Sequence, residues 1–353
     1  MTLQNYITQA RKDILEHVND FILSKKDIHS DLPYYKETLQ HFSTFIPQGK
    51  LMRGILILLI AEAYGHKRTP QLLSAATAIE FTHSTLLIHD DIMDEDEVRR
   101  GNATIYSIYK HEALTHNINN SLLYGQSMAI CIGDIGLYLG IEELLKASSD
   151  LTLVQKVTTD FIREIQYTGA AQMDDVALGH MQNEPSQEQI KRVYTYKTGR
   201  YTFSLPMKIG GLLAHAPEKE LQLLDSMGEK LGIMFQLRDD YIGLTGSEQI
   251  IGKPAGSDIR QNKKTLIRAM LLEKADSEDK KKALSLFGNT HITKDDIDNV
   301  IQLMNKYHVF EEINKFNKET SESSIKALDQ LTISAEYKSL LKELILLNTD
   351  RSK

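Results

Sequence analysis

The chain has 353 residues, of which 41% are hydrophobic and 25% charged, the proportions of an ordinary globular protein with a large core. Its net charge of −7 and its lack of a basic stripe argue against general binding of nucleic acid. The longest apolar run, Gly54–Ala61, is too short to span a membrane, and the N-terminus shows no signal-peptide pattern. We therefore expect a cytoplasmic protein without an integral membrane segment. Cys131 is the only cysteine, which excludes an intrachain disulfide.

Helical periodicity predominates along the chain, and strict alternation of apolar and polar residues is absent. The sequence therefore predicts an all-α protein without a sheet. We expect a helix over 187–214, kinked at Pro206, and another over 221–243. The charged stretches 274–282 and 316–325 are typical of loops.

Lys50 and Arg53 precede the apolar run and are three residues apart, which would make them neighbours on one helix face. A basic pair of this kind is ordinarily solvated. His83 shares a helical stripe with Asp90, and the ordinary interpretation of such a residue is a core histidine.

The first acidic motif, Asp90-Asp91-Ile92-Met93-Asp94, ends an apolar helical pattern. Asp90 and Asp94 would share a helix face, roughly 6 Å apart, and two such carboxylates can hold Mg²⁺ together with substrate phosphates. A solvated helix end is the plainer alternative. A calcium-binding loop is excluded because Glu95 and Gly101 stand where that loop needs glycine and glutamate. The arginines that follow, Arg99 and Arg100, would either neutralise the acids or clamp a phosphate.

The second acidic motif, Asp239-Asp240, follows an apolar stripe, so its carboxylates would be desolvated unless something binds them. Metal ligation would offset that cost. Downstream, a glycine-rich segment carries Lys253 and Lys263, which is either a surface turn or a loop over phosphate oxygens. Carboxylates beside basic residues, found twice, predict a site for a metal ion and a polyphosphate-bearing substrate.

Together these segments resemble the trans-isoprenyl diphosphate synthases of the polyprenyl synthetase family. The resemblance covers about residues 45 to 270. It has six motifs in order: GKLMR (49–53), EFTH (80–83), HDDIMDEDEVRRG (89–101), YKTGR (196–200), FQLRDD (235–240) and GKPAGSDIRQNKKT (252–265). It implies one domain over residues 1–353, a bundle of mostly antiparallel helices around a central cavity (isoprenoid synthase type) that includes the C-terminal helices 271–353. Family members are normally homodimers.

The resemblance also implies a head-to-tail prenyltransferase. An allylic diphosphate ionises, its carbocation alkylates the double bond of isopentenyl diphosphate, and a proton is lost to the released diphosphate. Three Mg²⁺ ions stabilise the charge that develops on the leaving group.

The family's functional residues carry over by position. The expected metal ligands are Asp90 and Asp94 for two ions and Asp239 for the third, with Asp91, Asp175 and Asp240 acting nearby or through water. The residues expected at the allylic diphosphate are Arg99, Lys197, Gln236 and Lys253, supported by Thr198 and Lys263. Those expected at the isopentenyl diphosphate are Lys50, Arg53, His83 and Arg100. Asp90, Asp94, Asp239, Lys197 and Arg99 form the catalytic group.

One departure from the family pattern is Gly243, which stands where many members have the last aspartate of the second motif. We expect activity despite it. Product length in the family depends on the residues five and four places before the first aspartate, here Thr85 and Leu86. Because Thr85 is small, we expect the pocket floor one turn (~5.4 Å) deeper, at Phe81. A C20 product is expected, with C15 or C25 and longer as alternatives.

Two alternative functions remain. A class I terpene cyclase shares the ionisation step but takes no second diphosphate, which leaves Lys50, Arg53 and Arg100 without a role. A non-catalytic regulatory subunit of a prenyl diphosphate synthase typically loses the metal-binding acids, whereas both pairs remain here.

Overall fold

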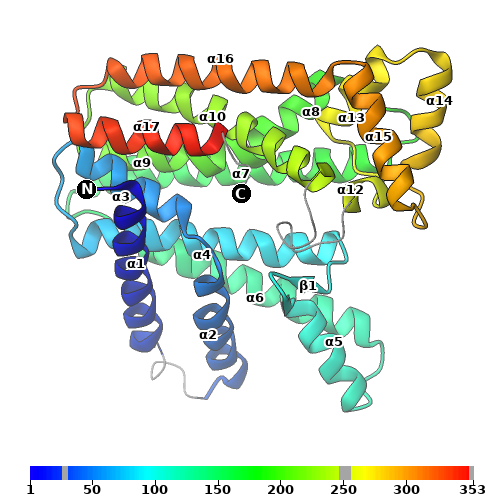
Figure 1. Ribbon diagram of the computed structural model, residues 1–353. Helices are drawn as coiled ribbons and strands as arrows, with labels where there is room; N and C mark the ends of the chain where they lie inside the picture. The colour runs from blue at the N-terminus through cyan, green and yellow to red at the C-terminus, as the bar shows by residue number, and fades with distance from the viewer. Residues whose placement is uncertain (26–30, 246–255, 350–353) are drawn as a thin grey trace. The chain divides into compact units, whose positions relative to one another are not determined.

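The computed structural model describes residues 1–25, 31–245 and 256–349, and these are almost entirely helical (Figure 1). The all-α prediction is therefore confirmed. Contacts within the chain define two compact units, which are described separately below. The first unit comprises Met1–Asp160 and Pro206–Pro217, and the second comprises Phe161–Leu205 and Glu218–Lys353.

The first unit is built around a long helix pair, α4 and α6, which lie side by side (Figure 1). Its elements are α1 (Leu3–Lys25), α2 (Pro33–Phe45), η1 (Ile46–Gln48), α3 (Met52–Ala63), α4 (Pro70–Met93), β1 (Val98–Arg99), β2 (Asn102–Ala103), α5 (Ile105–Thr115), α6 (Ser121–Leu144), the start of α7 (Leu151–His180) and most of α9 (Leu205–Leu213).

Glycines on one face of α6 allow α4 to approach closely. A Cβ atom at Gly136 would stand 2.5 Å from Thr85 Oγ1, and one at Gly140 would stand 2.8 Å from Thr82 Oγ1. Contacts under 3.0 Å are not tolerated without movement, so larger residues at these positions would push the helices apart. The fit of α4 against α6 therefore depends on these two glycines.

The strands β1 and β2 form a two-residue antiparallel hairpin immediately after the first acidic motif. The expectation that the chain has no strand pairing is wrong at this point. The turn residues Arg100 and Gly101 have φ angles of 52° and 76°, and positive φ at both central positions is the pattern of a type I′ turn. The hairpin is too short for a period-two pattern to appear in the sequence.

The α3 helix begins at Met52, two residues later than a helical pair of Lys50 and Arg53 requires. Leu51 has a φ of 54° and a left-handed conformation, so Lys50 precedes the helix and the i, i+3 spacing does not apply to it. The expected shared helix face of Lys50 and Arg53 is therefore wrong.

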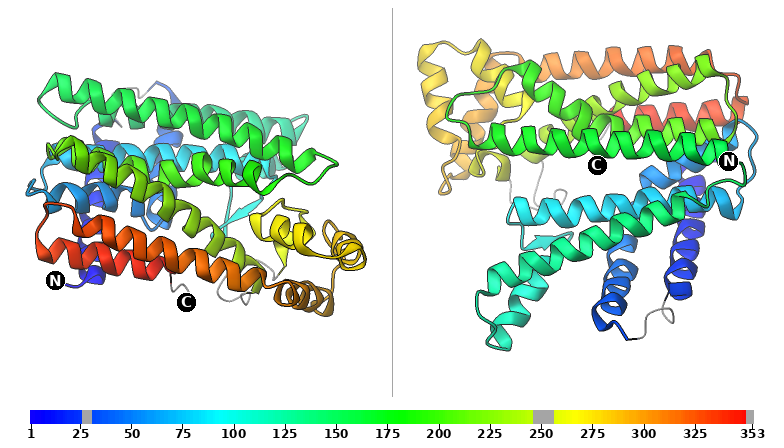
Figure 2. Two further views of the ribbon diagram at one scale, coloured as in Figure 1. Left: turned by 90° about the horizontal axis from the view of Figure 1, so that it is seen from above. Right: turned by 180° about the vertical axis from the view of Figure 1, so that it is seen from behind.

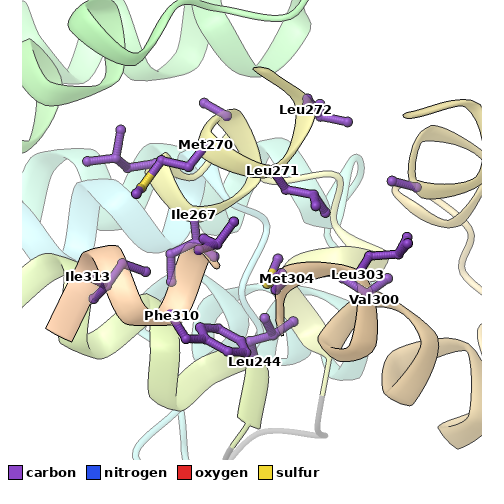
Figure 3. Close-up of a cluster of buried hydrophobic side chains, with 14 of the residues drawn as sticks. Leu244, Ile267, Met270, Leu271, Leu272, Val300, Leu303, Met304, Phe310 and Ile313 are labelled. Atoms are coloured by element: carbon purple, nitrogen blue, oxygen red, sulfur yellow. The ribbon is translucent and has the colours of Figure 1, made fainter. Parts of the chain in front are cut away.

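In the second unit, the long helix α10 packs against the C-terminal helices α16 and α17, which run side by side (Figure 2). The elements are the rest of α7, α8 (Gln187–Val193), η2 (Tyr194–Ser204), α10 (Glu218–Thr245), α12 (Ser257–Arg260), α13 (Leu266–Lys274), α14 (Ser277–Leu286), α15 (Lys294–Lys306), α16 (Val309–Asp329) and α17 (Ala335–Thr349). Apolar side chains of α10, α13, α15 and α16 meet in a buried cluster around Ile267, Met304 and Phe310 (Figure 3).

The segment η2 is an eleven-residue π-helix, and it lies directly against α10. A Cβ at Gly232 of α10 would stand only 2.0 Å from Gly199 Cα of η2, so the two backbones approach as closely as glycine allows. The expected helix over 187–214 is thus interrupted by the widened π segment before Pro206. π segments of this kind commonly occur at functional sites.

Both predicted charged loops are wrong, because they lie largely within helices. The helix α14 starts at Ser277, where the Asp276 carboxylate accepts hydrogen bonds from the Glu278 and Asp279 amides at 3.0 and 2.9 Å. The helix α16 passes through 316–325 with a buried face that includes Asn317, Thr320 and Ser324. Polar residues on a buried face conceal the helical hydrophobic period.

Two parts of the described chain are long and apolar enough to cross a membrane by length and composition alone: α6, and α2 with η1 and α3 if that strongly bent pair counts as one span. The core helices of soluble proteins pass the same test. The absence of an integral membrane segment stays a prediction.

Candidate active site

The first acidic motif lies at the C-terminal end of α4. Asp94 is the C-cap residue, and its amide donates to Asp90 O at 2.8 Å, so the two aspartates are one helical turn apart as expected. Asp94 is exposed, Asp90 is partly exposed and Asp91 is buried. The motif therefore offers carboxylates to solvent at a helix end while anchoring itself through Asp91.

Arg99 of β1 reaches back to this motif. Its Nε donates to Asp91 Oδ1 at 2.5 Å, and its Nη2 lies 3.5 Å from Asp90 Oδ2. Burial raises the pKa of Asp91 to about 6, and the Arg99 guanidinium opposes that rise. The other oxygen, Asp91 Oδ2, is buried and accepts no hydrogen bond from any residue that the structure describes. Arg99 neutralises the acids here, and its expected binding of a diphosphate stays a prediction.

A cluster of cations surrounds His83 in the same unit. Removal from water lowers the pKa of His83 well below its ordinary value, and the charges of Arg53, Arg100 and Arg99 lower it further. Desolvation and the neighbouring Arg99 and Arg53 also lower the pKa of Arg100. Cations that destabilise one another in this way form a ready site for an anion.

Glu80 holds this cation cluster to the start of α3. Its Oε1 accepts a hydrogen bond from the Gly54 amide at 2.8 Å, and burial raises its pKa while Arg53 lowers it. Arg100 lies close to Gly49, the first residue of the GKLMR motif, since a Cβ at Gly49 would stand 3.2 Å from Arg100 Nη1. The structure thus brings together Arg53, His83 and Arg100. Lys50 follows Gly49 and is exposed.

In the second unit, the second acidic motif on α10 is joined to η2 by a chain of hydrogen bonds. Thr198 Oγ1 donates to Gln236 Oε1 at 3.1 Å, and Gln236 Nε2 donates to Asp240 Oδ1 at 3.0 Å. Tyr194 donates its hydroxyl proton to the other oxygen of Asp240. The two expected residues Thr198 and Gln236 are therefore in direct contact. Tyr194 was not predicted, although it lies three residues before Lys197.

Lys197 of η2 forms an ion pair with Asp175 of α7, with 2.6 Å between Nζ and Oδ2. Asp175 was expected to act near the metal ions or through water, and the structure places it beside an expected diphosphate ligand. As with Arg99, a cation expected to bind substrate is held by a carboxylate. Lys253 lies outside the described residues.

The position of Gly243 is adjacent to another carboxylate. A Cβ at Gly243 would stand 3.0 Å from Asp258 Oδ2, and Lys263 Nζ lies 3.9 Å from Asp258 Oδ1. Asp258 belongs to the sixth motif but received no role from the sequence. An aspartate in place of Gly243 would bring a second negative charge against Asp258.

The donor groups fit magnesium. Within residues 1–25, 31–245 and 256–349, no three acidic, histidine or cysteine side chains lie close enough together to hold a metal ion alone. Mg²⁺ prefers oxygen ligands and usually binds through one or two carboxylates with substrate phosphates and waters, so it needs no such cage. The buried, unsatisfied Asp91 Oδ2 and the carboxylates of Asp90, Asp94 and Asp239 are ligands of this type.

Comparison with known proteins confirms the resemblance seen in the motifs. The family model described as "Polyprenyl synthetase" matches residues 33–304. A geranylgeranyl diphosphate synthase from Sulfolobus acidocaldarius is 31% identical over 305 residues, covering 86% of each chain. A farnesyl diphosphate synthase from Bacillus subtilis is 29% identical, covering 77% of this chain and 91% of its own.

Solved structures show the same fold. A geranylgeranyl pyrophosphate synthase from Corynebacterium glutamicum, complexed with isoprenyl diphosphate and magnesium, superposes with a TM-score of 0.89 at 25% identity. That match covers 99% of this chain and 100% of the other. A geranylgeranyl pyrophosphate synthetase from Pyrococcus horikoshii gives a TM-score of 0.83 at 28% identity and covers 99% of both chains.

The buried Asp240 should make stability depend on pH in metal-free protein. Burial raises its pKa from 3.8 to about 7 and outweighs the hydrogen bonds from Tyr194 and Gln236, which lower the pKa; the charges of Asp258 and Asp239 add to the rise. Between these values the folded state holds a proton that the unfolded state has lost, so stability falls as pH rises. Asp240→Asn removes this loss. We compare the free energy of unfolding of the variant with that of wild type at each pH. The difference should shift in favour of the variant by about 1–3 kcal/mol between pH 4 and pH 8.

Urea unfolding with EDTA at both pH values measures this difference. Asp174→Asn is the control, because the Asp174 side chain is about half exposed and pairs with Arg192 at 3.3 Å. The assignment is wrong if Asp240→Asn and Asp174→Asn show the same pH dependence.

Proposed function

Because the chain belongs to the polyprenyl synthetase family, we propose that it condenses isopentenyl diphosphate with an allylic diphosphate to give a longer all-trans prenyl diphosphate. The enzyme class expected from the motifs, a prenyltransferase, is confirmed by the family and its curated relatives. The observation that carries the choice of substrates is the cation cluster of Arg53, Arg100 and Arg99 around His83. It supplies charge for a second diphosphate in addition to the one held at the acidic motifs.

The two arginines of the hairpin support separate roles. Arg99 contacts Asp90 and Asp91, so a diphosphate bound there would lie at the acidic motif, as an allylic substrate requires. Arg100 lies beside Gly49, and its charge interacts more strongly with Glu80 and Arg53 than with Asp91. We assign it with Lys50, Arg53 and His83 to isopentenyl diphosphate. A terpene cyclase would have no use for this second group.

Magnesium is the cofactor of this family. We propose three ions, two held by Asp90 and Asp94 and the third by Asp239, with Asp91 and Asp240 supporting. When bound, they supply positive charge that stabilises the leaving diphosphate. Lys197, Thr198 and Gln236 would orient the same diphosphate, together with Lys253 and Lys263.

The substrate's phosphate oxygens would replace carboxylates as the partners of two cations that already form ion pairs. Arg99 is held by Asp91 and Lys197 by Asp175, so each cation is already oriented before it binds a phosphate oxygen. Such preorganisation reduces the cost of ordering flexible side chains. Metal ions would compensate the carboxylates that lose their partners.

The reaction itself needs no side-chain base. The allylic carbon–oxygen bond breaks with its electrons leaving on diphosphate, and the π electrons of isopentenyl diphosphate form the new carbon–carbon bond. The proton lost from the resulting carbocation passes to the released diphosphate. His83 would act by binding, because its lowered pKa keeps it neutral and able to donate one ring hydrogen bond.

We propose a C20 product, with C15 or C25 and longer as the other outcomes. The support is the small Thr85 and the buried Phe81 on α4, with Leu86 half-buried beside them. Named relatives include both geranylgeranyl and farnesyl diphosphate synthases.

We also propose that residues 1–353 act as one domain, because the family match over 33–304 runs through both compact units. A homodimer is supported by α6, which exposes a row of large apolar residues in the single chain: Leu122, Leu123, Ile130 and Tyr138. Exposed apolar surface of this extent is typical of an interface. Light scattering that gave the mass of one 40.1 kDa chain would contradict the dimer.

The function is tested by incubating purified protein with Mg²⁺, radiolabelled isopentenyl diphosphate and, separately, C5, C10 and C15 allylic primers. We expect label in dephosphorylated alcohols longer than the primer, sized by chromatography. Diphosphate release from a primer without incorporation would favour a cyclase. The absence of both activities would favour a regulatory subunit.

Asp90→Ala should lower the rate of condensation about a thousandfold, which corresponds to roughly 4 kcal/mol of lost transition-state stabilisation. The reason is the loss of a ligand for the ions that stabilise the leaving group. Asp174→Ala is the control, since its half-exposed carboxylate pairs with Arg192, which belongs to none of the six motifs. Near wild-type turnover of Asp90→Ala, measured at saturating Mg²⁺, would overturn the metal assignment.

A further inference from the structure

The wall beside Thr85 contains an aromatic ring from a helix that the sequence did not connect with product length. A Cβ at Gly136 of α6 would stand 2.1 Å from Phe42 Cζ and 2.5 Å from Thr85 Oγ1. Thr85 in turn donates a hydrogen bond to Gly133 O at 3.0 Å. The ring of Phe42, on α2, therefore fills the space where Thr85 meets α6, and only glycine at position 136 leaves room for it.

Phe42 also belongs to a contiguous set of three rings. Its centroid lies 5.3 Å from that of Phe81, and the Phe81 centroid lies 5.6 Å from that of Phe21 on α1. Phe42 and Phe81 have no exposed surface, and Phe21 has 5%. The three rings come from three different helices and form a tightly packed, buried aromatic cluster in the first unit.

We propose that Phe42 is the residue that limits product length in this chain. The proposal rests on the proposed function and on a prenyl tail that follows α4 past Thr85. Such a tail finds a small side chain at Thr85, but the Phe42 ring already occupies the adjacent space against Gly136. It meets that ring before it reaches Phe81, one turn (~5.4 Å) further along α4.

Two features make Phe42 the limiting ring of the three. Phe42 lies against both helices of the α4–α6 pair, at Phe81 and at Gly136. The ring contact of Phe21, in contrast, is with Phe81. Phe42 also comes from outside the α4–α6 pair, so its removal opens space without disturbing the hydrogen bond between Thr85 and Gly133. The depth of the pocket beyond Thr85 therefore depends on Phe42 as well as on the small side chain at position 85.

The test uses full-length Phe42→Ala and Phe42→Leu with Mg²⁺, labelled isopentenyl diphosphate and a C15 primer. We expect the main product to lengthen by at least one isoprene unit in Phe42→Ala and by less in Phe42→Leu. The rate of the first condensation should stay within about threefold of wild type, because the diphosphate-binding residues are unchanged. Far-UV circular dichroism and thermal unfolding establish that each variant is folded, and Phe42→Leu decides if Phe42→Ala does not fold.

Phe21→Ala is the matched control, since it removes a ring that packs on Phe81 but not on Gly136. It should leave the product distribution unchanged. The proposal is overturned if folded Phe42 variants give the wild-type distribution, or if Phe21→Ala lengthens the product equally, which would indicate a general loosening of the core. An inactive wild-type protein would instead refute the proposed function, and this inference with it.

Discussion

Carboxylates removed from water must be balanced by donors or cations, because an uncompensated buried charge costs several kcal/mol. This constraint organises both acidic motifs. Asp91 is held by Arg99, and Asp240 is held by Tyr194 and Gln236. The hairpin after α4 and the π segment η2 each present the partner that their acid requires. The hairpin and the π-helix therefore each supply a side chain from outside the helix that carries the acid, and that side chain compensates the buried carboxylate.

The same constraint explains why expected substrate ligands occur in ion pairs. Arg99 and Lys197 each contact a carboxylate, which orients the cation and compensates its charge. The group around His83 differs, because its three arginines repel one another and only two buried carboxylates, Glu80 and Asp91, act on them among the residues named here. One diphosphate would thus exchange with existing carboxylates, and the other would fill a site with an excess of positive charge.

The sequence was sufficient to predict the helical class and the helix that carries the first acidic motif, since these follow from long periodic segments. The grouping of Arg53, His83 and Arg100 was implied by the resemblance to the family. Prediction from the sequence failed where tertiary contacts decide. Leu51 takes a left-handed conformation before α3, and α16 buries polar residues such as Asn317. Tyr194, Glu80 and Phe42 were missed because each acts on a residue distant in sequence. The proximity of Asp258 to Gly243 was not predicted either, because it depends on the tertiary fold.

The type I′ turn between β1 and β2 has a consequence for how finely the two anion sites are separated. Arg99 and Arg100 are consecutive, yet one contacts the acids at the end of α4 and the other lies beside Gly49. Their divergence comes from backbone direction at a strand end, which is stiff, and does not rely on the reach of flexible side chains. Insertion of a single residue here would rotate one guanidinium relative to the other. The length of the hairpin therefore fixes the relative positions of Arg99 and Arg100. Insertions and deletions, which surface turns ordinarily tolerate, would be unfavourable here.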